Sequence, residues 1–352
     1  MTYGAQDNGM AENKLKTLTL DELLAHPFPQ REHLVFPWLR QGESALIWAA
    51  PGIGKTMLSL TLALAVAGGG SVLGWESTAP RSVLYVDGEM NAADLRDRLE
   101  MLAGTVEDLD MAAARRNLRV LSRQFQGGEV TFPDLAEDQA PDGANRLPGQ
   151  EVVLREARRH KAELVIIDNL TTCAGVDDEN AAASMAPVIQ FLLKIKQAGH
   201  GCILVHHSDK GGNNFRGSSA IATTFEVILG LRRLESHEAG AGAAFELDWT
   251  KYRGRPTAAT RAAEVRLVRE PPQWTSKPAS KAELEALLEA ARSCQFATQR
   301  ALADHLGWDT GKVSRLKHRA IRESKISAAE WKEALSGTPK VDPEAGEENQ
   351  DF

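Results

Sequence analysis

Residues 49–56 read Ala-Ala-Pro-Gly-Ile-Gly-Lys-Thr, which is the composition of a loop that binds phosphate. Gly52 and Gly54 let the backbone turn so that successive N–H groups point at phosphate oxygens. Lys55 is placed to reach the β- and γ-phosphates of a nucleotide, and the Thr56 hydroxyl is placed to bind Mg²⁺. The pattern departs from GxxxxGK[ST] at its first position, where Ala49 replaces glycine and a small residue suffices. The predicted nucleotide contacts are Ala50, Pro51, Gly52, Ile53, Gly54, Lys55, Thr56 and Met57.

Two further segments supply carboxylates. Residues 164–168 form an apolar run that ends in Asp168, which is typical of a Walker B strand whose carboxylate holds Mg²⁺ through water. Asn169 follows it, so the carboxylate that activates water must come from elsewhere. We predict Glu89, at the end of the second strand and beside the strand of the phosphate loop. Asp87 is a supporting carboxylate, and a plain polar turn over residues 87–89 is the alternative.

Apolar runs alternate with helical patterns over residues 40–275. Strands are expected at 44–48, 82–86, 118–121, 164–167, 202–205, 227–231 and 245–249. Helices are expected at 55–67, 92–102, 150–160 and 181–197. Continuous apolar strands between helices predict a mostly parallel sheet covered on both faces, with the last strands as an antiparallel edge. A short helix at 18–26, a long loop at 124–149 and a linker at 271–280 complete this prediction.

Composition limits the class of protein. The 352 residues carry a net charge of −7, which excludes a uniformly basic nucleic-acid binder but allows a local basic face. Three scattered cysteines are too few for a disulfide framework and fit a reducing compartment. The polar N-terminus does not resemble a signal peptide, and the most apolar stretch, 57–67, is too short to span a bilayer. We therefore expect a cytoplasmic protein with no membrane partner.

The C-terminal part has a helix–turn–helix pattern. Residues 297–306 predict one amphipathic helix, 307–309 a turn, and 310–323 a second helix with an apolar face. The second helix carries five basic residues and a single acid, which suits a recognition helix in a DNA groove. We predict nucleic-acid contacts from Lys312, Arg315, Lys317 and Arg319. A helical bundle for subunit packing is the alternative.

Taken together, the motifs resemble a known family. Residues 51–56, 86–90, 166–169, 205–207 and 216–219 are similar, in order and spacing, to RecA-like AAA-type ATPases of the RepA plasmid-helicase group. The resemblance covers about residues 18–270. It implies an α/β RecA-like P-loop NTPase core that uses ATP and Mg²⁺. It further implies a hexameric ring that moves on single-stranded DNA in plasmid, phage or mobile-element replication.

The resemblance also assigns roles to His206 and His207. In the family this position senses the γ-phosphate and couples it to DNA-binding loops. A metal site completed by Asp209 and a purely structural pair are the alternatives. The loop from 208 to 219, with Lys210 and Arg216, resembles the central-pore loop of ring helicases, and an ordinary surface loop is its alternative.

A late strand ends in Thr-Lys-Tyr-Arg. Ring helicases of RecA-like fold carry a Lys-x-Arg here, which implies that Lys251 and Arg253 reach the neighbouring subunit's nucleotide as an arginine finger. Arg255 is a competing candidate. The alternative without a catalytic role is a charged strand end that faces solvent.

These inferences predict four parts. Residues 1–17 are a flexible tail, 18–275 the RecA-like ATPase domain, 281–335 a small all-α helix-turn-helix (winged-helix-like) domain, and 337–352 an acidic tail. The expected activity is ATP hydrolysis coupled to DNA, with single strands in the pore loop and duplex DNA on the C-terminal helices. One alternative is a DNA-binding regulator that uses ATP as an oligomerisation switch. The other is a recombination ATPase of the RecA or RadA kind.

Overall fold

The computed structural model describes residues 17–28, 30–125, 149–170, 182–209, 214–216, 219–234, 242–293 and 295–335. The chain separates into two units, residues 1–32 and 33–352. The first unit contains α1 (Leu20–Ala25). Its start is fixed by a capping box, because the Thr19 hydroxyl accepts from the Glu22 N–H at 3.2 Å and the Glu22 carboxylate accepts from the Thr19 N–H at 2.7 Å. The short helix expected near the N-terminus is thus confirmed.

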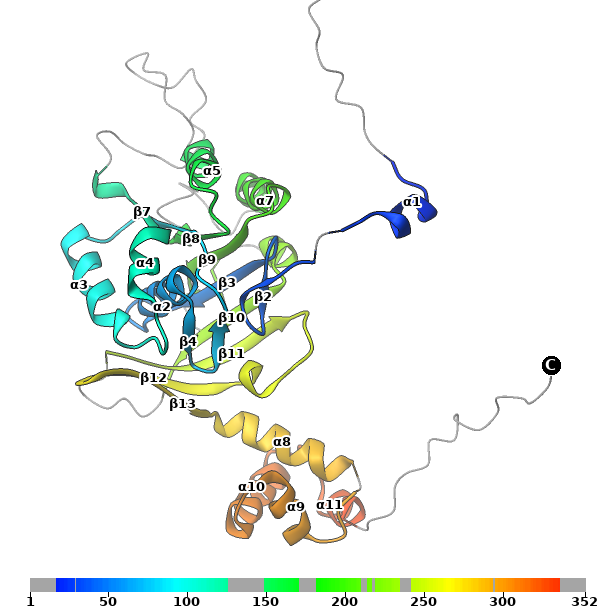
Figure 1. Ribbon diagram of the computed structural model, residues 1–352. Coiled ribbons are helices and arrows are strands. Elements are labelled where there is room, and N and C mark those ends of the chain that lie inside the picture. Colours follow the sequence, from blue (N-terminus) through cyan, green and yellow to red (C-terminus); the bar gives the residue numbers. More distant parts are fainter. Residues whose placement is uncertain are drawn as a thin grey trace, which may run out of the picture. The chain divides into compact units, whose positions relative to one another are not determined.

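The second unit is built on a sheet that has nine strands in the described part of the chain (Figure 1). Their order across the sheet is β13-β12-β11-β10-β3-β9-β8-β6-β7. The strands from β10 to β7 in this order run parallel, whereas β10 to β13 form an antiparallel meander. The bounds are β3 (Ser44–Ala49), β6 (Val83–Asp87), β7 (Leu118–Ser122), β8 (Leu164–Asp168), β9 (Gly201–His207), β10 (Val227–Arg233), β11 (Ala243–Tyr252), β12 (Ala263–Arg269) and β13 (Pro272–Pro278). The predicted mostly parallel α/β fold class is confirmed.

Two predictions about the sheet are wrong. We expected β6, which precedes Glu89, to lie beside the strand of the phosphate loop, but β9 and β8 separate it from β3. We also expected a linker at 271–280, but β13 pairs there with β12 from Pro272 to Pro278. As an edge strand, β13 tolerates the two prolines at its ends because only one side of it must donate hydrogen bonds to the sheet.

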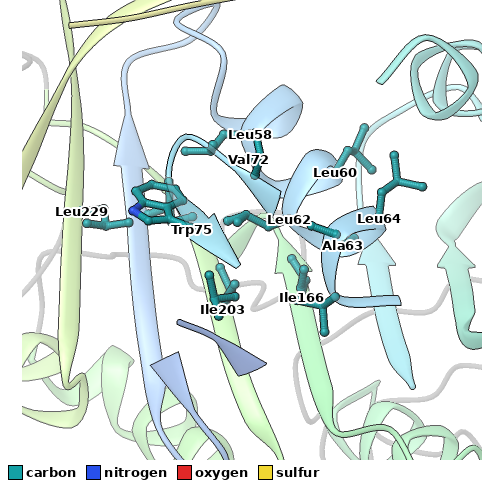
Figure 2. Packing of buried hydrophobic residues seen from close by; sticks show 14 of the residues in the cluster. Leu58, Leu60, Leu62, Ala63, Leu64, Val72, Trp75, Ile166, Ile203 and Leu229 are labelled. Atoms are coloured by element: carbon teal, nitrogen blue, oxygen red, sulfur yellow. The ribbon is translucent and has the colours of Figure 1, made fainter. Parts of the chain in front are cut away.

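Helices cover both faces of the sheet (Figure 1). One face packs against α2 (Lys55–Gly68), α3 (Ala92–Ala103) and α4 (Met111–Asn117), and the other against α5 (Gly149–Arg159) and α7 (Ala182–Gln197). Two hairpins join the first layer, β1 (His33–Val35) with β2 (Leu39–Arg40) and β4 (Gly70–Val72) with β5 (Trp75–Ser77). Figure 2 shows Trp75 and leucines of α2 packed over the sheet, with Trp75 next to Leu229. Because α2 is buried almost all round, the helix behind the phosphate loop is held rigidly.

The C-terminal part of this unit contains α8 (Ser280–Arg292), α9 (Gln299–Leu306), α10 (Thr310–Arg322) and α11 (Ala328–Ala334). These helices share an apolar cluster of their own, with Leu287, Leu302 and Val313 fully buried. Gly307 ends α9 with a φ of +66°, which turns the chain toward α10. Residues 280–293 and 295–335 hold helices and no strand, so the hairpin that defines a wing does not occur there. Among the described helices, none has the length and apolar character needed to cross a membrane.

Candidate nucleotide site

The phosphate loop lies between β3 and α2, as the sequence predicts. Gly52 has a φ of +76° and Gly54 a φ of +121°, conformations that favour glycine. Gly54 is the N-cap of α2 and provides no side-chain cap, so the first N–H groups of the helix remain available to phosphate oxygens. The Lys55 side chain is buried in the same loop. Burial lowers the pKa of Lys55, while Asp168 and Glu89 act to raise it.

Asp168 ends β8 and faces the start of α2. It is 5% exposed, and the Thr56 hydroxyl donates a hydrogen bond to it. The Tyr85 hydroxyl also donates to Asp168 Oδ2, at 2.8 Å. Burial raises the pKa of Asp168, and the hydrogen bonds from Thr56 and Tyr85 together with the Lys55 charge oppose that rise. A hydroxyl beside a buried carboxylate is an oxygen donor set that fits Mg²⁺.

Glu89 follows β6 at the carboxyl ends of the parallel strands, where β8 ends in Asp168. Its side chain is 48% exposed, and its Oε1 lies 3.9 Å from His207 Nε2. The turn that carries Glu89 is held by Asp87, whose carboxylate accepts from the Met90 N–H at 3.2 Å and from the Ser122 hydroxyl at 3.3 Å. Burial raises the pKa of Asp87. Asp87 therefore supports the turn, and Glu89 is the carboxylate that is exposed to solvent.

The two histidines at the end of β9 point to opposite faces of the sheet. Alternation along the strand places His207 with Ile203, which packs in the cluster around α2, and His206 with Leu204, which packs in the cluster around α7. His207 Nε2 lies 3.3 Å from Asn169 Nδ2, and His206 Nε2 lies 2.8 Å from the Arg216 carbonyl oxygen. Their divergence argues against a shared metal ion, and the described residues contain no group of three or more His, Cys, Asp or Glu able to hold one.

The loop after β9 is anchored to this strand. The Arg216 N–H donates to the His207 carbonyl at 2.9 Å, and the Asp209 N–H donates to the Asn214 carbonyl at 2.8 Å. Ser208 and Phe215 form a bridge between these bonds. The predicted contact at Lys210 lies outside the described residues, and the Arg216 side chain is exposed.

Lys251 and Arg253 lie near the amino ends of the parallel strands, whereas the phosphate loop follows the carboxyl end of β3. β10 runs parallel to β3, and its Leu231 pairs with Ala49 next to the loop. β11 runs antiparallel to β10, so its last residues pair with the start of β10 instead. These two side chains therefore cannot reach the phosphate loop of their own chain.

Both basic side chains have contacts within the chain. Lys251 Nζ donates to the Ala222 carbonyl at 2.7 Å, and burial, followed by the Arg253 charge, lowers the pKa of Lys251. Arg253 Nη1 lies 3.7 Å from Glu226 Oε1, with 59% of its side chain exposed.

The basic residues of α10 differ in their surroundings. Lys312 Nζ lies 2.7 Å from Glu283 Oε1 and 4.4 Å from the centre of the Trp308 ring, so this lysine joins α10 to α8 and the turn. Arg319 Nε donates to a glutamate one turn later at 2.7 Å. Arg315 is exposed. Lys317 Nζ lies over the Trp331 ring, 5.8 Å from its centre, so Arg315 is the most exposed of the four predicted DNA contacts on α10.

Two site residues were missed from the sequence. Tyr85 on β6 and Ser59 on α2 lie with their hydroxyl oxygens 2.9 Å apart, and Ser59 Oγ is 3.4 Å from Asp168 Oδ2. The signal that could have found Tyr85 is its hydroxyl in the otherwise apolar run 83–86.

The arrangement can bind and hydrolyse a nucleoside triphosphate. The loop and Lys55 would hold the phosphates, and Thr56 with Asp168 would hold Mg²⁺. Bound there, Mg²⁺ neutralises charge on the phosphates. The role of Glu89 as the base that takes a proton from the attacking water stays a prediction.

Two comparisons relate the chain to known proteins. A sequence model of the AAA domain family matches residues 11–213, more than half of the chain. Among solved structures, the chain is similar to a KaiC-like protein from the hyperthermophilic archaeon Pyrococcus horikoshii OT3, with 15% sequence identity and a TM-score of 0.47. That similarity covers 70% of this chain and 94% of the other. The chain therefore belongs to the AAA domain family and, with its phosphate loop, Walker B carboxylate and mostly parallel sheet, is a P-loop ATPase.

Proposed function

We propose that this ATPase is a ring-forming motor that couples ATP hydrolysis to movement on single-stranded DNA, as a replicative helicase of a plasmid, phage or mobile element does. The observation that carries the proposal is the pair of divergent histidines on β9. His207 lies 3.9 Å from the candidate base Glu89, and His206 is bonded to the loop at Arg216. A change at the γ-phosphate that shifts the end of β9 is therefore passed directly to the loop that we assign to DNA.

The first test measures ATP hydrolysis with and without single-stranded DNA, with Lys55→Ala as the blank. Lys55 contacts the phosphates in our assignment, so its truncation should abolish turnover. A motor should be stimulated several-fold by single strands, and a strand-displacement assay then separates unwinding from translocation. A slow rate that single strands leave unchanged contradicts the motor.

A second test addresses the coupling, and the chain offers a matched control just before the same strand. His206→Gln removes a buried imidazole that bonds to the Arg216 carbonyl. His200→Gln removes another buried imidazole, just before β9, whose Nδ1 bonds to the Ala162 carbonyl. We expect the ratio of hydrolysis with and without DNA to fall toward one in His206→Gln and to persist in His200→Gln. Equal ratios in the two variants would contradict the coupling.

The position of Arg253, after the end of β11 and away from the phosphate loop, supports an oligomeric active form. Because it cannot reach its own phosphate loop, an arginine-finger role for Arg253 requires a neighbouring subunit. We expect Arg253→Ala to lose activity on the order of 10³-fold. Mixing it with Lys55→Ala subunits, which still offer Arg253, should restore part of the rate. Absence of recovery in subunits shown to exchange argues against the role in trans.

The rival function is a DNA-binding regulator that uses ATP as an oligomerisation switch. It is favoured by the exposed Arg315 and Arg322 on α10. A regulator should bind duplex DNA through residues 297–323 and hydrolyse ATP slowly. Arg315→Ala should then weaken duplex binding and reduce its salt dependence, whereas the motor predicts that hydrolysis stimulated by single strands survives this substitution.

A further inference from the structure

The hydroxyl of Tyr85 lies in the interior of the nucleotide site. The ring belongs to β6 and is fully buried. Alternation along β6 places Tyr85 on the face of the sheet that packs against α2, with Val83, while Leu84 and Val86 pack on the other face. A buried hydroxyl needs a partner, because leaving it unpaired costs free energy. Its position thus depends on polar atoms reached from β8 and α2.

Those partners are both in the site. Tyr85 donates to Asp168 Oδ2 at 2.8 Å, a hydrogen bond to a group that is charged when it binds Mg²⁺. The Ser59 hydroxyl lies 2.9 Å from the Tyr85 hydroxyl. With the Tyr85 proton committed to Asp168, the Ser59 hydroxyl can donate to the Tyr85 oxygen at 2.9 Å, and the Thr56 carbonyl at 3.1 Å is the other acceptor within its reach. Ser59 comes one turn after Lys55 and Thr56, so it lies on the same side of α2 as the residues that bind the nucleotide.

We propose that Tyr85 is a positioning residue for the Walker B carboxylate, acting with Ser59. The Tyr85 hydroxyl holds Oδ2 of Asp168, so the carboxylate keeps one orientation toward Thr56, where Mg²⁺ binds. The same bonds tie β6, which leads to Glu89, to β8 and to α2. Tyr85 does not touch the reacting atoms in this proposal, because it acts through Asp168 alone.

Comparable outer contacts of metal ligands are worth about 10- to 100-fold in metal affinity or activity. For Tyr85→Phe, which keeps the ring and removes the hydroxyl, we expect about a 10-fold higher Mg²⁺ concentration at half-maximal hydrolysis. Affinity for a fluorescent ATP analogue should fall in Mg²⁺ and remain unchanged in EDTA. Ser59→Ala should shift both measurements in the same direction by a smaller factor.

Thr61→Val is the matched control. Thr61 lies on the same helix as Ser59, and its buried hydroxyl donates to the Met57 carbonyl at 2.8 Å and accepts from the Trp274 indole at 3.0 Å. Thr61→Val removes a buried hydroxyl of α2 that does not contact Asp168. It therefore shows how the loss of such a hydroxyl alone affects stability and nucleotide binding. We expect the ratio of nucleotide affinities in Mg²⁺ and EDTA to stay at the wild-type value in this variant.

The experiment is run on the full chain without DNA, so it rests on the nucleotide site and is independent of the proposed motor. A Mg²⁺-to-EDTA affinity ratio that is unchanged in Tyr85→Phe, or lowered equally in Thr61→Val, overturns the proposal. If Tyr85→Phe fails to fold, Ser59→Ala decides by the same ratio. A lowered ratio in either site variant, with the control unchanged, supports the proposal.

Discussion

Gly54→Ala tests how the phosphate loop is packed. Gly54 has a φ of +121°, which residues with a side chain rarely adopt. A Cβ at this position would lie 2.5 Å from the Cβ of Ala243, at the start of β11, and 3.5 Å from the Phe245 ring. Ala243 is 4% exposed and its Cβ is fixed by the backbone, so it cannot turn away. The substitution therefore carries two separate costs, backbone strain and overlap with β11.

The structure allows each cost to be assigned a size. A residue held in a sparsely populated backbone region loses about 1–3 kcal/mol. Forcing an extra methyl into a packed interior loses about 1–3 kcal/mol more. We thus expect Gly54→Ala to lower the free energy of unfolding by about 2–6 kcal/mol, a large part of the 5–15 kcal/mol that is typical of a domain.

Two companion variants separate the costs. Gly52→Ala changes a glycine of the same loop with a φ of +76° and nothing within 4 Å of the new Cβ, so it carries strain alone, about 1–2 kcal/mol. Ala243→Gly removes the atom that Gly54→Ala strikes and costs about 0.5–1 kcal/mol by itself. In the double variant the overlap disappears, so the two changes should be non-additive by about 1–3 kcal/mol in the stabilising direction.

The assay is urea unfolding of the four variants, with nucleotide affinity measured on the same samples. Affinity should fall more in Gly54→Ala than in Gly52→Ala, because displacing the loop misplaces the first N–H groups of α2. The reasoning is refuted if Gly54→Ala is no less stable than Gly52→Ala. It is also refuted if Ala243→Gly and Gly54→Ala are simply additive.

Three further predictions concern the site, the core and the edge of the sheet. Glu89→Gln should retain ATP binding and lose about 10²–10⁴-fold in hydrolysis, and retained turnover would remove Glu89 from the role of base. Gly230→Ala should lower the free energy of urea unfolding by about 1–3 kcal/mol, because its Cβ would lie 2.5 Å from the buried Trp48 ring; an unchanged midpoint contradicts this packing. Burial alone would raise the pKa of Glu226, but hydrogen bonds, first from Lys196, outweigh it and hold that pKa below its ordinary value. The resulting stabilisation is present above the unfolded pKa of about 4 and is lost as pH falls through the folded pKa, so Glu226→Gln should unfold with less acid dependence between about pH 5 and 2.

Features of the site that depend on a few adjacent residues could be predicted from the sequence. The turn at Gly52 and Gly54, the lysine after it and the carboxylate that ends β8 could all be predicted, because each follows from a few adjacent residues. The helices after residue 296 could be predicted for the same reason, since their apolar spacing and the left-handed Gly307 are local signals.

Arrangements that depend on distant segments could not be predicted. Nothing near Glu89 reveals that two strands separate β6 from β3, since strand order is set by crossovers far along the chain. β13 was misread because its flanking prolines resemble a linker until a partner strand is known. The surroundings of Lys312 were hidden too, because Glu283 lies 29 residues away on another helix. The hydrogen bond from the Tyr85 hydroxyl could not be predicted either, because its partner Asp168 is 83 residues away.

The contacts at the end of β11 distinguish the two candidates for a residue acting in trans. Lys251 donates at 2.7 Å to a backbone carbonyl, and moving it would leave that carbonyl without this partner. Arg253 is mostly exposed and its contact with Glu226 is long, at 3.7 Å. Exposed ion pairs contribute about 0–1 kcal/mol, so Arg253 can leave this contact at little cost. Glu226 keeps Lys196 as its partner at 2.8 Å when Arg253 moves away. In the proposed oligomer, Arg253 is therefore the side chain better placed to reach a neighbouring nucleotide, while Lys251 maintains the strand end that presents it.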